Sequence, residues 1–95
     1  MTESDGLIAS ALLGDEAKKF KESDFGKCLI GMANQEADLA LAALATVKPT
    51  DVQAIERLQN RVWLGRHFEE FVDELLTSGE NALALWSQKN NESQN

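Results

Sequence analysis

The stretch from Val52 to Leu76 constrains the fold of this chain most, because it reads as one uninterrupted helix about 25 residues long. Pro49 cannot continue a helix that arrives from its N-terminal side, so the long helix must begin after it. Thr50 stands in the position of an N-terminal cap, with Gln53 three residues later in capping-box spacing. Gly79 can adopt a left-handed C-terminal conformation. The sequence therefore predicts a helix over residues 50–77.

The apolar side chains of this helix lie on two different faces. At about 100° per residue, one face gathers Val52, Ile55, Leu58 and Val62. A nearly opposite face gathers Leu64, Phe68, Phe71 and Leu75, and the change occurs around Trp63. A single neighbouring helix covers only one of these faces. The other requires either the N-terminal segment or a second copy of the chain.

A second long helix is predicted over residues 24–47, opened by the capping signal Ser23-Asp24. The connection over residues 48–50 is short, so the two helices should lie antiparallel as a helical hairpin. We expect one apolar face of the earlier helix to meet the later one; its residues are Phe25, Cys28, Leu29, Met32, Leu39, Ala40, Ala43 and Val47. Leu41 and Leu44 form another apolar stripe, and burying it again requires a third helix or a second subunit.

Glu36 interrupts the face that is expected to meet the long helix. In an antiparallel hairpin, Arg61 and Arg66 each lie about one turn or less from the position opposite Glu36. We therefore expect a partly buried ion pair between Glu36 and one of these arginines. Such pairs contribute little net stability but specify which residues face each other.

The remaining segments complete an all-α domain over residues 7–79. A short helical segment from Leu7 to Phe20 should buttress the hairpin, as one bent helix or as two short helices separated at Gly14. Outside the domain, residues 1–6 are expected to be flexible, residues 80–87 to form a short helical turn and residues 88–95 to form a disordered tail.

Composition excludes several classes of function. The formal net charge of -7 argues against a nucleic-acid partner. No apolar stretch is long enough to cross a membrane and no signal peptide is evident, so we expect a cytoplasmic protein without membrane contact. The single His67 and single Cys28 supply no metal-ligand or catalytic cluster. We expect no enzyme activity, no cofactor and no metal, and we expect Cys28 to pack in the core.

Three short motifs resemble a known group of proteins. They are the runs LLGDEA at residues 12–17, LQNR at residues 58–61 and the segment from Phe68 to Leu75. Over residues 12–79 the chain is similar to small helical proteins encoded in tailed-phage and prophage genomes, which accompany virion-assembly genes. The resemblance implies an accessory or assembly role, with a location in the host cytoplasm or on the virion, and it implies no catalytic residues.

These observations favour a non-enzymatic interaction protein that forms a homo-oligomer or binds another protein. The expected interface consists of Leu64, Phe68, Phe71, Leu75, Leu41, Leu44 and Trp63. The alternative is an acidic mimic of nucleic acid that binds a basic groove on a host enzyme. Its acidic residues would be Glu69, Glu70, Asp73 and Glu74.

Overall fold

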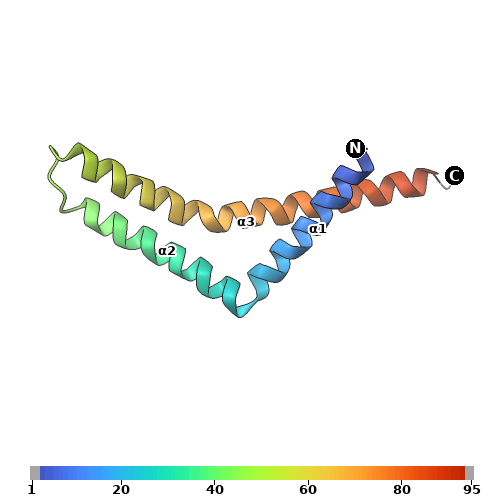
Figure 1. Cartoon of the computed structure of the whole chain (residues 1–95), viewed down its shortest axis with the longest axis horizontal. Helices are drawn as coiled ribbons and strands as arrows, with labels where there is room; N and C mark the ends of the chain where they lie inside the picture. Colours follow the sequence, from blue (N-terminus) through green and yellow to red (C-terminus); the bar gives the residue numbers. More distant parts are fainter. Residues whose placement is uncertain (1–2, 94–95) are drawn as a thin grey trace. The chain divides into compact units, whose positions relative to one another are not determined.

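The computed structural model describes residues 3–93, with side chains described as far as residue 91. The described chain forms three α-helices and no β-strand, which confirms the predicted all-α class (Figure 1). Helix α1 spans Glu3–Glu22, α2 spans Asp24–Leu44 and α3 spans Val52–Ser93.

Helix α1 is a single helix that includes Gly14, so the option of two short helices does not apply. It also begins earlier than predicted, because Glu3–Gly6 are helical, while Met1 and Thr2 lie outside the described residues. Its end is defined by Ser23. The backbone N–H of Ser23 donates to the carbonyls of Lys19 and Phe20 at 3.0 and 3.2 Å, and its hydroxyl donates to the Phe20 carbonyl at 2.6 Å. These bonds use carbonyls that a helix end leaves without partners.

The connection between α2 and α3 is longer than predicted, because α2 ends at Leu44 rather than Val47. The backbone N–H of Asp51 donates to the Lys48 carbonyl at 2.9 Å, closing a turn that contains Pro49. Asp51 also provides the N-terminal cap that was predicted for Thr50. Its carboxylate Oδ1 accepts from the backbone N–H of Ala54 at 3.1 Å.

Helix α3 continues through Gly79 to Ser93. This corrects the predicted helix end at Thr77, the separate turn over residues 80–87 and the disordered tail over residues 88–95, of which Gln94 and Asn95 lie outside the described residues. Gly79 does not end the helix because it is buried against another helix. After Gly79, Ala82 is buried and Lys89 pairs with Glu3. Tertiary contacts of this kind outweigh the weak tendency of a single glycine to end a helix.

The helices are organised in two compact units. The terminal unit combines Met1–Ser23 with Phe71–Asn95, and the central unit is Asp24–Glu70. The terminal unit therefore contains α1 and the later part of α3. The central unit contains α2 and the earlier part of α3.

Small residues form the contact within the central unit. The buried positions are Gly26, Ile30, Ala37 and Ala40 of α2 with Ala54 and Gly65 of α3, so that all but Ile30 are glycine or alanine. A Cβ atom at Gly65 would lie only 2.5 Å from the Ala33 carbonyl oxygen and 2.7 Å from the Ala37 Cβ. Together with ion pairs between the same helices, these contacts are compatible with the predicted antiparallel hairpin.

The predicted facing side of α2 is corrected in part, because Ala40 is buried as expected but the largest side chains of that face are not. Phe25, Met32 and Leu39 are 69 %, 56 % and 58 % exposed, so they do not fill the space between the helices. Alanine and glycine occupy that space instead, because small side chains let two helix backbones approach closely. Phe25, Met32 and Leu39 are therefore left outside.

The terminal unit uses an even closer contact. A Cβ atom at Gly14 would lie 2.6 Å from the Cα of Gly79, and the reverse distance is the same. Ala17, Val72 and Ala82 are buried around this crossing. At the two ends of the contact, Lys21 pairs with Asp73, and the Nζ of Lys89 lies 2.6 Å from the carboxylate of Glu3. These pairings show that α1 and this part of α3 run antiparallel.

Candidate interaction surface

The central unit has an apolar groove of 370 Å³ along one side of its helix contact. Its lining residues are Ala33, Glu36, Arg61, Leu64, Gly65 and Phe68. Leu64 is 62 % exposed and Phe68 is half-buried. The structure therefore brings together two of the residues that the sequence assigned to the interface, Leu64 and Phe68.

One ion pair belongs to the same groove. The Nη2 of Arg61 lies 3.0 Å from the Oε2 of Glu36, and the two side chains are 57 % and 55 % exposed. The pair therefore lies at the surface rather than partly buried as expected. It places one positive and one negative charge beside Leu64 and Phe68.

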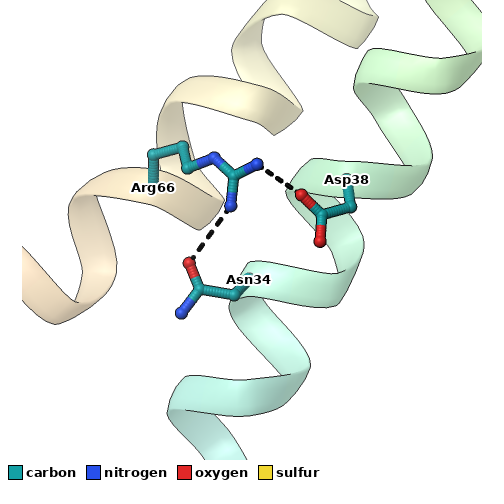
Figure 2. A network of polar contacts seen from close by, with 3 residues as sticks. All are labelled: Asn34, Asp38 and Arg66. Atoms are coloured by element: carbon teal, nitrogen blue, oxygen red, sulfur yellow. Dashed lines mark hydrogen bonds and ion pairs between the residues drawn. The ribbon is translucent and has the colours of Figure 1, made fainter.

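Arg66 has different partners from those expected. Figure 2 shows its guanidinium between two residues of α2, with Nη2 paired to the Asp38 carboxylate and Nη1 donating to the Asn34 amide oxygen at 3.4 Å. Neither Asp38 nor Asn34 lines the groove. The two arginines thus connect α2 to α3 through separate sets of residues.

Trp63 also lies outside the groove lining. It is 58 % exposed and stacks on His67 with ring centroids 4.3 Å apart. The His67 Nδ1 lies 2.8 Å from the Trp63 carbonyl oxygen, and its Nε2 lies 3.6 Å from the Glu70 carboxylate. These contacts hold the tryptophan ring on the helix surface.

The other predicted interface residues lie apart from the groove. On α2, Leu41 is 54 % exposed and Leu44 is half-buried. In the terminal unit, Phe71 is 60 % exposed and Leu75 is half-buried, with its carbonyl oxygen close to the Gly14 position. Helix α1 therefore packs on the later part of α3 but leaves Phe71 exposed.

Sequence reasoning missed a second apolar groove, in the terminal unit. Its volume is 430 Å³, and its lining residues are Leu7, Ile8, Ala11, Leu12, Asp15, Leu83 and Trp86. The available signal was the spacing of Leu7, Ala11 and Asp15 at intervals of four, which places them along one side of a helix. Placing the end of the long helix near Gly79, and leaving open whether the N-terminal helix breaks at Gly14, concealed this relation.

The outward side of α2 is a third apolar surface. Besides Phe25, Met32 and Leu39 it includes Cys28, which is exposed and not in the core as expected. The signal for this surface is the spacing of its residues. Positions 25, 28, 32, 35, 39 and 42 alternate steps of three and four, the repeat of helices that pair in coiled coils.

Electrostatic contacts engage several acidic residues. Asp73 pairs with Lys21, and Glu70 lies near His67. On α1, the hydrogen bond and charge of Asp15, followed by the charge of Glu16, raise the pKa of Lys19 above its ordinary value. Part of the acidic surface is therefore engaged in contacts with basic side chains.

Within the described residues, the side chains form no group of three or more metal-ligating residues. None of the helices that the structure describes has both the length and the apolar character needed to cross a bilayer. No family model, curated protein or solved structure matches the chain. The surfaces described above therefore provide the basis for assigning a function.

Proposed function

We propose that this chain is a non-enzymatic interaction protein that self-associates through apolar helix surfaces and works as a phage accessory or assembly factor. One observation supports this most directly. Among the described residues no large side chain is fully buried, while thirteen large hydrophobic side chains are exposed. Exposed apolar surface of this extent is typical of proteins that bury it against a partner.

The small-residue contacts explain why these side chains stay outside. The closest helix contacts are made by glycine and alanine, with Ile30 also buried in the central unit and Val72 in the terminal unit, whereas no leucine or phenylalanine of the described residues is buried. A further helix layer is needed to cover the larger side chains. The antiparallel hairpin that we infer for the central unit would present this surface on a rigid scaffold.

The groove around Leu64 and Phe68 fits a second copy of the chain. It combines apolar side chains with the Glu36–Arg61 pair, which has one charge of each sign. When two copies meet about a two-fold axis, the same patch faces itself, so a patch containing both charges can be self-complementary. The apolar area would provide about 25 cal/mol per Å² buried.

The proposed role and location follow from the resemblance to tailed-phage proteins. An assembly factor of this kind would act in the host cytoplasm or on the virion, without a nucleic-acid or membrane partner. The alternative, an acidic mimic bound to a basic groove, predicts binding that weakens steeply with salt. Apolar self-association should stay constant or strengthen slightly with salt.

Sedimentation equilibrium at several concentrations, in low and moderate salt, tests the proposal. We expect a concentration-dependent oligomer whose mass does not fall with salt. Leu64→Asp should weaken association at least tenfold, which corresponds to about 1.4 kcal/mol. Gln59→Asp on the same helix is a matched control that should associate normally.

Circular dichroism separates a lost interface from a lost fold. Leu64→Asp and Phe71→Asp should both retain the helical content of the parent chain, because both side chains are exposed. A monomeric parent chain at every concentration would contradict self-association. Loss of helicity in both variants would mean that these side chains support the fold.

A further inference from the structure

The outward side of α2 provides a second self-association surface, separate from the groove at Leu64 and Phe68, and this inference rests on the function proposed above. We infer that α2 pairs with α2 of a second copy as an antiparallel coiled coil. The pairing seam consists of Phe25, Cys28, Met32, Gln35, Leu39 and Ala42. This seam lies on the opposite side of α2 from Ala37 and Ala40, which pack against α3.

The spacing of the seam selects a helix as the occupant. Steps of three and four residues keep the side chains in line along a helix that winds around another helix, so that each side chain fits between residues of its neighbour. The seam repeats this pattern over almost the whole length of α2, from Asp24 to Leu44. Its three largest side chains are also among the most exposed apolar residues of the central unit.

The sizes of the seam residues favour an antiparallel second copy. Large residues occupy positions 25, 32 and 39, and smaller or polar residues occupy positions 28, 35 and 42. Antiparallel pairing places Phe25 against Ala42, Cys28 against Leu39 and Met32 against Gln35 of the other copy. Each layer then contains one larger and one smaller side chain. Parallel pairing would place large on large and small on small, leaving alternate layers crowded and underfilled.

The charges beside the seam are complementary in the same arrangement. Beside the seam layers, Asp38 of one copy flanks Gly31 of the other, and the exposed Lys27 is one turn from that glycine on the outer side of its helix. A Cβ atom at Gly31 would meet nothing within 4 Å, so the lysine side chain has open space to cross. Asp38 keeps 65 % of its side chain exposed while paired with Arg66. Lys27 and Asp38 thus carry opposite charges on the same flank of the two-helix pair, and the helix dipoles oppose each other favourably.

Disulfide cross-linking of the full chain tests the direction of pairing. In the proposed register, Cys28 lies opposite position 39 of the other copy, within the Cα separation that a disulfide requires. Two copies of Cys28 are displaced along the helix by 11 residues, about 16 Å, and cannot be joined. The same separation prevents a disulfide between positions 28 and 39 of one helix.

We expect the Leu39→Cys variant to form covalent dimers under mild oxidation. The parent chain, with Cys28 alone, should not do so. The Cys28→Ser, Leu39→Cys double variant is the matched control with a single thiol at position 39, and it should also remain uncoupled. Leu39 is 58 % exposed, so the substitution leaves the contact with α3 intact.

The other outcomes separate this inference from the proposed function. Cross-linking of both single-thiol chains would mean parallel pairing and would overturn the antiparallel arrangement. An oligomer by sedimentation that forms no cross-link in any variant would overturn the α2 seam while preserving self-association. A parent chain that is monomeric by sedimentation would overturn both, including the case in which a different protein supplies the covering helix.

Discussion

The central and terminal units are built by the same kind of contact but differ in the chain separation that the contact joins. In the central unit, α2 and α3 are connected by the short segment that contains Pro49. In the terminal unit, Lys21 meets Asp73 across 52 positions, and Glu3 meets Lys89 near the chain ends. The entropic cost of closing a loop rises slowly with its length. The contact between α1 and the later part of α3 can therefore form at little extra cost once the central unit has formed. The terminal unit should therefore be the first to open.

The two contacts also differ in what the glycine meets. In the terminal unit, glycine faces glycine, and each would place a Cβ against backbone of the other helix. In the central unit, Gly65 faces a carbonyl oxygen and the methyl group of Ala37. Neither contact has a flexible side chain opposite the glycine that could move away, so a larger residue should be poorly tolerated in both units.

The largest effect is expected from Gly14→Leu. Its side chain would clash with the Gly79 backbone and should destabilise the terminal unit by about 3 kcal/mol. Hydrogen exchange should accelerate in residues 3–22 and 71–93 and stay unchanged in residues 24–70. Gly6→Leu is the matched control on the same helix, since a Cβ there would meet nothing within 4 Å. Equal exchange in both variants would show that the glycine contact does not hold the unit together.

A smaller effect is expected from Gly65→Ala in the central unit. The added methyl group would lie 2.5 Å from the Ala33 carbonyl oxygen and should cost about 2 kcal/mol, as overpacking does. Gly31→Ala, on the open side of α2, should instead stabilise the chain by about 1 kcal/mol through helix propensity. Urea denaturation measures both. Stabilisation by Gly65→Ala would mean that the helices lie farther apart than described.

Replacing the N-terminal capping residue of α3 should cause an intermediate loss of stability. Asp51→Ala removes the acceptor for the Ala54 N–H and should reduce the stability of the central unit by about 1 kcal/mol. Thr50→Ala should have little effect, because the hydrogen bond at the helix start comes from Asp51. Thermal unfolding of the two variants distinguishes the capping residue. A larger loss from Thr50→Ala would reverse the assignment.

The smallest effects are expected from the ion pairs, where the two units can be compared directly. Arg66→Met removes the contacts with Asp38 and Asn34, and Lys21→Met removes the contact with Asp73. All of these side chains remain partly exposed, so each variant should lose less than about 1 kcal/mol, and salt should reduce the difference. A loss that persists in high salt would indicate lost packing of the long side chains instead.

The all-α class and the general positions of the helices could be predicted from the sequence. The turn at Pro49 and the capping signals mark where two helices meet, and local chemistry of this kind is readable without a structure. The extent of α3 could not be read in the same way. Gly79 is a sound signal for a helix end, and only the contact with Gly14, 65 positions away in the chain, gives it a different role.

The candidate interface was harder to predict because size, rather than hydrophobicity, decides which side of a helix is covered. The predicted face grouped Met32 and Leu39 with Ala40 on hydrophobicity alone, but of these three only Ala40 is buried. Close backbone approach reverses that choice, and its favourable dispersion contacts are spread over many atoms. Leu64 and Phe68 could be identified as neighbours because they are four residues apart on one helix.

The contact between Gly14 and Gly79 also has a hereditary consequence. A larger residue at either position alone forces the two backbones apart, so selection should act on both positions together. The exposed apolar residues are constrained only by the partner that covers them. Descendants of this gene should therefore retain a pair of very small residues at these two places even after their outer surfaces have diverged. Such a pair, separated by 65 positions on two helices, would identify homologous proteins even where overall sequence identity is low.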